Sequence, residues 1–349
     1  MLPQISDLNV IGYEELKSPA ELIQEYPVPE SSIKTIVESR NAIKDIMDNK
    51  DDRKIVILGP CSIHNPSEAL EYAKKVSNLE EKVGDKFLLV MRTYFEKPRS
   101  TTGWKGLISD PYMDETFDMQ KGLEQARKLL IDITSMGVPV GTEFLGSVTP
   151  QYIGDLVSWA AIGARTSESQ PHREMASGLS MPVGFKNATS GYIGSAVNSI
   201  LSAQSPHYFL GINLQGKDCR IATRGNKYCH VILRGGNLSA NYDMESILKT
   251  KKKLQDKDLN STIVVDCSHG NSGKNYEIQP SVFKSVLNQS LDEYSIKGLM
   301  IESNLFDGKQ SISKGISNLE KGVSITDACL GWKKTEELFL EGYEILKRG

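Results

Sequence analysis

The chain has 349 residues, enough for one large or two medium domains, and a composition of 39% hydrophobic and 24% charged residues excludes a disordered or fibrous protein. The 41 basic and 44 acidic side chains give a net charge of −3, which disfavours a nucleic-acid or membrane-surface binder. With no apolar run of roughly 18 residues, no secretory signal pattern and five irregularly spaced cysteines, we expect a cytoplasmic protein without disulfides or membrane partners.

Residues 1–53 precede the first predicted strand and are expected to form an N-terminal extension. They contain the capping box Ser18-Pro19-Ala20-Glu21 and an amphipathic helix near Ser31–Met47. Oligomer or regulatory contacts are one interpretation of this extension. Simple decoration of the main domain is an equally good one.

From residue 54 onward, short apolar runs alternate with helical patterns. Most of the runs are continuously apolar, which is typical of parallel strands covered on both faces. The runs are Ile55–Leu58, Phe87–Met91, Val138–Phe144, Ala160–Ala164, Val183–Phe185, Val231–Leu233, Ile263–Val265 and Leu299–Ile301. Eight such runs, each with a helical segment, predict a (β/α)8 TIM barrel over residues 54–349. An open doubly wound sheet is the alternative.

One segment, residues 207–225, interrupts this alternation before the sixth barrel strand. Short strands are expected on either side of Gln215-Gly216, at Phe209–Asn213 and at Arg220–Thr223. This pattern predicts a small inserted β-hairpin.

In a barrel of this kind the active site forms at the carboxyl ends of the strands, and each predicted strand here ends near an ionisable or metal-binding side chain. Seven of these are basic: Arg92, Arg165, Lys186 and Arg234 at strand ends, and Lys97, Arg99 and Lys105 in the loop after the second strand. Taken alone, the loop residues could be a solvated basic surface. Together, seven cations predict a site for two phosphorylated or carboxylated substrates.

A second group at the same rim comprises Cys61, His269, Glu302 and Asp327. None has the local spacing of a metal motif, and each taken singly has an ordinary structural explanation. A thiolate, an imidazole and two carboxylates on one rim nevertheless predict a mixed site for a divalent Mn, Fe, Co or Zn ion. Such an ion acts as a Lewis acid toward a carbonyl oxygen.

At every predicted strand the sequence resembles the type I 3-deoxy-D-arabino-heptulosonate 7-phosphate (DAHP) synthases, from about Leu16 to the C-terminus. The segments that carry the resemblance are Gly59–His64, Met91–Arg99, Gly103–Gly106, Gly163–Thr166, Glu168–Gln170, Gly184–Asn187, Ile232–Gly236, Asp266–Ser272, Ile301–Ser303 and Ser324–Cys329. The resemblance implies condensation of phosphoenolpyruvate with erythrose 4-phosphate at a divalent metal, the first step of the shikimate pathway. It also implies a homo-oligomer, either a dimer or a tetramer.

The resemblance further implies the role of each site residue. The implied metal ligands are Cys61, His269, Glu302 and Asp327. The implied phosphoenolpyruvate site consists of Arg92, Lys97, Arg165, Lys186 and Arg234, with Glu143 beside it. The implied erythrose 4-phosphate site consists of Arg99 and Ser100. Lys97, Lys186, His269 and Glu143 are the implied catalytic residues. Ser100 stands where the family often has Thr, a change that keeps the hydroxyl.

Enzymes similar to this one are often inhibited by an aromatic amino acid bound away from the barrel mouth. The corresponding pocket involves Gln151, Ser180, Phe209 and Gly211, with Asp7 of the partner subunit. Because Gly211 leaves more room than a Ser, the resemblance favours tyrosine over phenylalanine as the effector.

Three other functions remain open at this point. The first is a 3-deoxy-octulosonate 8-phosphate synthase-like condensation with arabinose 5-phosphate, against which the loop Lys97–Ser100 and the N-terminal extension both argue. The second is a Schiff-base aldolase with Lys186 as the nucleophile. The third is a non-catalytic sugar-phosphate sensor that uses residues 1–53 for partner contacts.

Overall fold

A closed barrel of parallel strands forms the centre of the molecule in this computed structural model, which describes residues 5–348 apart from the side chain of residue 314. The barrel strands are β1 (Lys54–Gly59), β2 (Phe87–Arg92), β3 (Val140–Glu143), β4 (Trp159–Ile162), β5 (Val183–Lys186), β8 (Cys229–Leu233), β9 (Ile263–Asp266) and β10 (Ile296–Asn304). Each strand pairs in parallel with the next, and β10 pairs with β1 to close the barrel. This confirms the predicted TIM barrel and excludes the open sheet.

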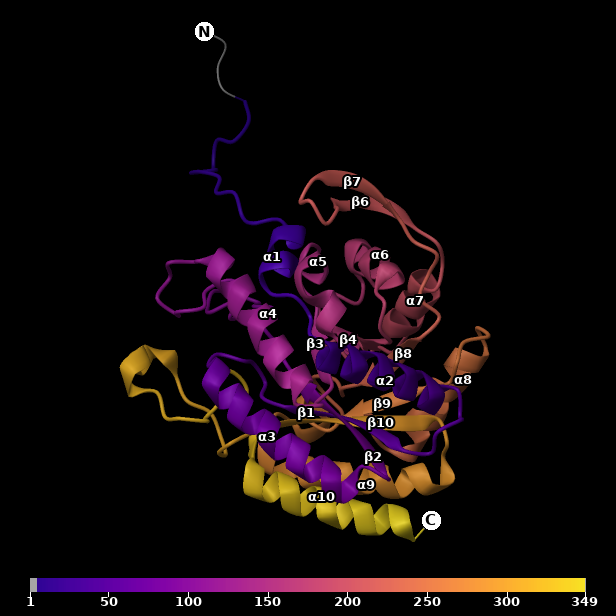
Figure 1. The fold of residues 1–349 in the computed structure, drawn as a ribbon. Coiled ribbons are helices and arrows are strands. Elements are labelled where there is room, and N and C mark those ends of the chain that lie inside the picture. Colours follow the sequence, from indigo (N-terminus) through magenta and orange to yellow (C-terminus); the bar gives the residue numbers. More distant parts are fainter. Residues whose placement is uncertain (1–4, 349) are drawn as a thin grey trace.

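Helices surround the barrel (Figure 1). They are α3 (Pro66–Val83), α4 (Met119–Ser135), α5 (Thr149–Ile153), α6 (Gln170–Gly178), α7 (Gly194–Ala203), α8 (Met244–Gln255), α9 (Gln279–Asp292) and α10 (Trp332–Lys347). Asn65 caps α3, because its side chain accepts hydrogen bonds from the N–H groups of Ser67 and Glu68. The helices therefore cover the outer face of the apolar strands.

The helix after β3 is short. The apolar residues Ile153, Leu156 and Val157 keep helical spacing, but α5 ends at Ile153 and a 3₁₀ turn, η1 (Gly154–Leu156), follows. Arg127 donates to the carbonyl of Tyr152, and Arg40 donates to that of Gly154. These side chains satisfy carbonyl groups at the helix end, so the chain can leave the helix early.

The N-terminal extension supplies the floor of the barrel. After the short helix α1 (Pro19–Glu25), helix α2 (Glu30–Met47) places Ile43, Ile46 and Met47 in one buried cluster with the inward-facing strand residues. These include Ile55, Ile57, Leu88, Val90, Trp159, Ile232, Val264 and Met300. The amino end of the barrel is thus filled with apolar side chains, which leaves the carboxyl end for polar ones.

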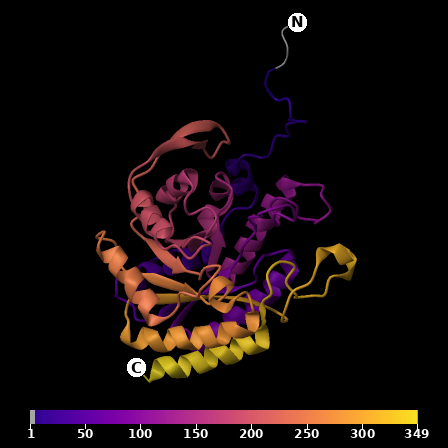
Figure 2. The same ribbon diagram turned by 180° about the vertical axis from the view of Figure 1, so that it is seen from behind.

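The predicted insertion is an antiparallel hairpin outside the barrel. Its strands are β6 (Tyr208–Ile212) and β7 (Asp218–Ala222), and residue Phe209 pairs with Ile221. Residues 5–17 lead away from the body on the same side as this hairpin, as both views show (Figures 1 and 2).

Two long loops project from one end of the barrel (Figure 2). One joins β2 to α4, and the other leads from β10 through the 3₁₀ turns η4 (Ile312–Lys314) and η5 (Ile316–Asn318) to the two-residue strand β11 (Leu330–Gly331). Both loops follow carboxyl ends of strands, so they frame the mouth of the barrel. None of the described helices combines the length and hydrophobicity needed to cross a bilayer.

Candidate active site

A cavity of about 160 Å³ opens at the carboxyl ends of the strands. Its basic lining residues are Arg92, Lys97, Arg99, Arg165, Lys186, Arg234 and Lys274. Six of these were predicted from strand ends and the loop after β2. Lys274 was not predicted, and Lys105 does not line the cavity. The concentration of positive charge fits a ligand with several anionic groups.

Arg92 is the deepest of these cations because β2 delivers it to the barrel interior. Along β2, Leu88 and Val90 face inward, so the two-residue period of a strand also turns Arg92 inward. The guanidinium is fully buried, and its Nη2 lies 3.2 Å from Oε1 of Glu302. One carboxylate therefore neutralises part of this buried charge.

Asp266, at the end of β9, connects two other site residues. Its Oδ2 lies 2.9 Å from Nδ1 of His269 and 3.4 Å from Nζ of Lys186, while Oδ1 accepts from the hydroxyl of Ser268. Burial alone raises a carboxyl pKa, but the charges of His269 and Lys186 reverse that effect and hold the pKa of Asp266 well below its usual range. Asp266 is therefore an anion that positions both the imidazole and the ammonium.

The predicted metal ligands converge. Donor atoms of Cys61, Glu302 and Asp327 all lie within 4.8 Å of one another, although they come from the β1 loop, β10 and the loop before β11. His269 lies outside that cluster of three, but its Nε2 is 3.8 Å from Oε1 of Glu302. Since Nδ1 is engaged by Asp266, Nε2 is the nitrogen that faces the cluster. Two carboxylates, a thiol and an imidazole fit a borderline divalent ion.

The Cys61 thiol is buried and lies beside the ammonium group of Lys97. Burial and the nearby Glu302 charge raise the pKa of Cys61, and Lys97 opposes this effect. Nζ of Lys97 lies 3.3 Å from Sγ and 3.0 Å from the carbonyl oxygen of Cys61. A metal ion at this position would favour the thiolate and strengthen that contact.

Glu143, at the end of β3, is a buried carboxylate that also lines the cavity. A Cβ at Gly163 would lie 2.5 Å from its Oε1, so a larger residue at position 163 would displace this carboxylate. Arg99 also lines the cavity and donates from Nε to the carbonyl of Trp104. Ser100 is exposed and is not among the lining residues.

Glu96 ties the loop after β2 to the loop after β3. Its carboxylate accepts hydrogen bonds from the N–H groups of Leu145 and Gly146 and from the hydroxyl of Thr149. It directly precedes Lys97, so the position of a cavity cation depends on the conformation of residues 145–149.

A second cavity, of about 340 Å³, lies between α5, α6 and the β6–β7 hairpin. Three residues predicted for the effector pocket line it: Gln151, Ser180 and Phe209. Oε1 of Gln151 is buried and has no hydrogen-bond partner within residues 5–348. Gly211 does not line the cavity, and Asp7 lies on the projecting N-terminal segment, where it accepts from the hydroxyl of Tyr13.

Tyr94 and Lys274 are among several lining residues that the sequence analysis did not assign to the site. Tyr94 follows Arg92 by two residues, so the alternation of β2 carried one step further would have found it. Lys274 lies in the turn after η2 (His269–Ser272), in a left-handed conformation with φ +62°. No periodic pattern in the sequence signals that position.

Comparison with known proteins identifies a matching family, and curated relatives and a solved structure agree with that match. Residues 28–340 match the family described as the DAHP synthetase I family. The chain is 48% identical to the Tyr-sensitive phospho-2-dehydro-3-deoxyheptonate aldolase of Escherichia coli over 98% of the chain and 96% of that protein. It is 47% identical to the tyrosine-inhibited phospho-2-dehydro-3-deoxyheptonate aldolase of Schizosaccharomyces pombe, over 95% of the chain and 90% of that protein. The structure of phospho-2-dehydro-3-deoxyheptonate aldolase from Francisella tularensis superposes with a TM-score of 0.95 at 44% identity, covering 97% of this chain and 99% of that one.

Proposed function

The chain belongs to the DAHP synthetase I family, and from this premise we propose which roles the cationic cavity and the four predicted metal ligands play in the reaction. The enzyme condenses phosphoenolpyruvate with erythrose 4-phosphate to give DAHP and phosphate, the first step of the shikimate pathway, under feedback by an aromatic amino acid. The observation that supports our residue assignment is that these two groups of side chains meet at one barrel mouth.

Phosphoenolpyruvate occupies the deep end of the cavity. Arg165, Lys186 and Arg234 hold its phosphate, and the buried Arg92 pairs with its carboxylate, with Lys97 beside both. Arg guanidinium groups suit this task because their planar fork pairs with two oxygens at once. Erythrose 4-phosphate enters from the open side, with its phosphate near Arg99 and Ser100 on the loop after β2.

A divalent ion, Mn, Fe, Co or Zn, would be held by Cys61, His269, Glu302 and Asp327. When bound, it supplies Lewis acidity toward the aldehyde oxygen of erythrose 4-phosphate. Asp266 keeps Nδ1 of His269 engaged so that Nε2 remains available as a ligand. Arg92 contacts Glu302, so in this assignment the phosphoenolpyruvate site and the metal site are neighbours.

The side chains then orient the two reacting carbons. C3 of phosphoenolpyruvate attacks the aldehyde carbon, and water adds at C2 before the C–O bond to phosphate breaks. Glu143 and Lys186 line the wall where that water is bound and its proton is taken up. Holding both substrates face to face provides a large part of the acceleration.

The ion pair between Lys186 and Asp266 argues against the Schiff-base alternative. A Schiff-base lysine is activated by an apolar pocket or by a neighbouring cation, both of which favour the neutral amine. Here Nζ of Lys186 is engaged in an ion pair with a buried carboxylate oxygen of Asp266, 3.4 Å away. Lys186 therefore serves as a binding and proton-transferring cation.

The second cavity binds the feedback effector, and tyrosine is the effector we favour. Besides Gln151, Ser180 and Phe209, apolar side chains such as those of Leu179 and Ile221 line this cavity, and Oε1 of Gln151 has no hydrogen-bond partner among the described residues. An aromatic ring with a polar group fits such a lining. Gly211 lies on β6 outside this lining, so it acts on the cavity through the hairpin.

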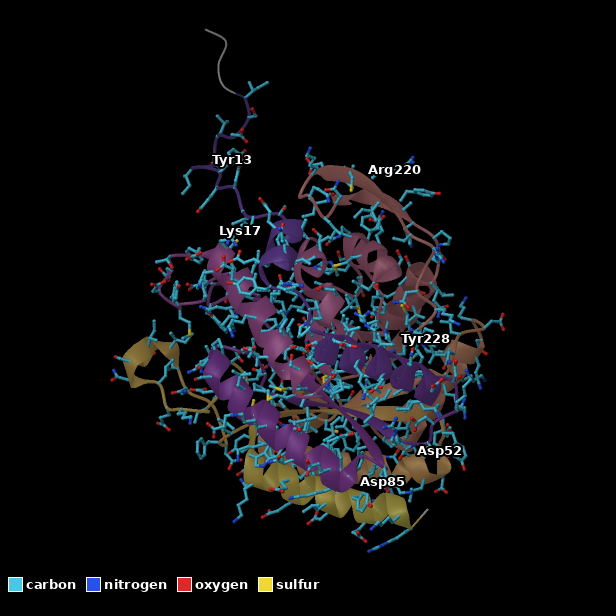
Figure 3. The ribbon with its side chains drawn as sticks, viewed as in Figure 1. Tyr13, Lys17, Asp52, Asp85, Arg220 and Tyr228 are labelled. Carbon is cyan, nitrogen blue, oxygen red and sulfur yellow. The ribbon has the colours of Figure 1, made fainter. Side chains whose placement is uncertain are left out.

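The assembly is a homo-oligomer in which the N-terminal segment lies against a second copy. Residues 5–17 lead away from the body, and Figure 3 shows Tyr13 on this segment beyond the barrel. Ile5, Leu8 and Ile11 are largely exposed in the single chain. Contiguous exposed apolar side chains of this kind mark an interaction surface. Light scattering of the full chain separates dimer from tetramer.

One assay tests the whole assignment. Loss of phosphoenolpyruvate absorbance is followed with erythrose 4-phosphate, with arabinose 5-phosphate, and with either sugar after chelation and metal add-back. We expect turnover with erythrose 4-phosphate but not with arabinose 5-phosphate. Chelation should abolish this turnover, and adding a divalent ion should restore it. Turnover that ignores chelation and traps with borohydride would instead establish the Schiff-base mechanism.

A further inference from the structure

Beneath the cationic cavity lies one aromatic ring, that of Tyr94. It is 1% exposed, yet it lines the cavity from below. It belongs to the buried cluster inside the barrel, with Trp159 and Met300. The backbone fixes it as well, because the N–H of Ile63 donates to the carbonyl of Tyr94. The ring is therefore a rigid floor between the apolar barrel interior and the charged mouth.

Three of the cavity's cations lie around this ring. Cζ of Arg92 is 3.9 Å from its centroid, Nζ of Lys97 is 5.6 Å away and Nζ of Lys186 is 6.0 Å away. Each cation also has an anchor of its own: Glu302 for Arg92, Cys61 for Lys97 and Asp266 for Lys186. The Tyr94 ring is the neighbour that all three cations have in common.

Three like charges gathered in a largely buried site repel one another, and repulsion would push the two flexible lysine side chains outward. The face of an aromatic ring carries a negative quadrupole that attracts cations within about 6 Å, most strongly where water is excluded. A ring at this place offsets the repulsion without introducing an anion that would compete with a bound phosphate or carboxylate.

We propose that Tyr94 is a positioning residue for phosphoenolpyruvate binding, and that its ring face holds Arg92, Lys97 and Lys186 in their binding arrangement before the substrate arrives. The inference rests on the proposed function of these three cations. The ring, rather than the hydroxyl, carries the effect, because the hydroxyl is buried and has no hydrogen-bond partner within the described chain.

The test compares ring substitutions by calorimetric titration of phosphoenolpyruvate into the full-length enzyme. Tyr94→Phe keeps the ring face, and we expect its Kd to stay within about twofold of wild type. Tyr94→Leu removes the quadrupole, and we expect the Kd and the KM for phosphoenolpyruvate to rise about 5- to 30-fold. The KM for erythrose 4-phosphate should change little. Equal losses in the two variants, or no loss in Tyr94→Leu, would overturn the proposal.

A shape-preserving series covers the case in which Tyr94→Leu does not fold. Fluorinated phenylalanines at position 94 weaken the quadrupole stepwise at nearly constant volume, so the Kd should rise with each added fluorine. A flat series would contradict the proposal.

Tyr72 provides a matched control. It is also a fully buried tyrosine whose hydroxyl has no partner among the described residues, but its ring packs on Trp332 and does not line the cavity. Tyr72→Leu should lower the Tm and leave phosphoenolpyruvate affinity unchanged. If it weakened binding as much as Tyr94→Leu, general loosening would explain both. A wild-type enzyme that did not bind phosphoenolpyruvate would refute the proposed function itself.

Discussion

Nδ1 of His269 lies 2.9 Å from a carboxylate oxygen of Asp266, and Asp266 is completely buried. This contact turns Nδ1 toward the Asp266 carboxylate and leaves Nε2 on the side of Glu302, 3.8 Å from its Oε1. The backbone of His269 is itself in the left-handed region, at φ +54°, which is costly for a residue with a side chain. The surrounding structure thus forces this imidazole into one orientation.

Asp266→Asn should therefore weaken metal binding without removing a metal ligand. Loss of such a supporting carboxylate costs about 10- to 100-fold in metal affinity. The measurement is recovery of activity during titration of the chelated enzyme with a divalent ion, supported by direct metal-binding calorimetry. We expect the midpoint to move to higher metal concentration and saturating metal to restore part of the activity. An unchanged midpoint would show that Asp266 does not orient His269.

Cys61→Ala and His269→Ala should each abolish turnover, because each removes a metal ligand. Cys229 offers the control: it is a fully buried cysteine on β8 that lies in the apolar layer between barrel and helices. Cys229→Ala creates a small core cavity and should lower the Tm while keeping the rate. Steady-state rates and bound metal are compared for all three variants. A near-normal rate in Cys61→Ala would refute the ligand assignment.

Much of this architecture could be predicted from the sequence because the barrel repeats one signal. Parallel strands buried on both faces are continuously apolar, and Arg92, Glu143 and Lys186 are each the last residue of their strand. Once the strands were placed, the topology alone brought these side chains to one rim. The hairpin was equally visible, because its two strands flank Gln215-Gly216.

What could not be predicted depends on how loops fold back. Asp327 reaches Cys61 because the loop from β10 returns on itself through two isolated bridges, one between Gly308 and Cys329 and one between Lys309 and Ser324. The turn that brings a further lysine, residue 274, into the cavity has no repeating pattern. Such contacts depend on tertiary packing, so local periodicity carries no information about them.

Glu96→Ala should loosen the loop that carries Lys97 and Arg99. It removes the acceptor for the N–H groups of Leu145 and Gly146, and losing hydrogen bonds to a charged group costs about 1.5–3 kcal/mol. We expect the free energy of unfolding to fall by that amount in urea titrations and the KM for erythrose 4-phosphate to rise.

Glu71→Ala is the control for Glu96→Ala. Glu71 forms an ion pair with the exposed Lys321, and exposed pairs contribute about 0–1 kcal/mol. Its KM values should match wild type. If Glu96→Ala behaved the same way, the hydrogen bonds to residues 145–149 would have no role in placing the substrate loop.

Gln151→Leu should uncouple the enzyme from its feedback effector. The buried Oε1 of Gln151 has no partner among the described residues, so a bound effector that donates to it gains a hydrogen bond that leucine cannot replace. Inhibition titrations with tyrosine and with phenylalanine compare the variant with wild type. We expect the tyrosine midpoint to rise at least several-fold with an unchanged uninhibited rate. No response of the wild type to millimolar tyrosine would discard tyrosine as effector.

His230 makes the stability of the fold depend on pH. Burial lowers its pKa to about 4, and the indole of Trp159 donates to its Nε2 at 3.1 Å. An unfolded histidine titrates near 6.5, so between these values the unfolded chain binds a proton that the folded chain does not. Stability is therefore complete above about pH 7 and falls as the pH drops, by about 1.4 kcal/mol per pH unit below 6.5.

His230→Gln isolates this contribution, because glutamine still accepts from Trp159 but does not titrate. Urea unfolding at pH 7.5 and pH 5.0 gives the loss of stability for each protein. Wild type should lose about 2 kcal/mol more than the variant over this interval. His64, whose pKa burial also lowers to about 4, is present in both proteins and cancels in the comparison. Equal losses in the two proteins would mean that His230 takes up its proton in the folded state, and the hydrogen bond from Trp159 would then have to break as the pH falls.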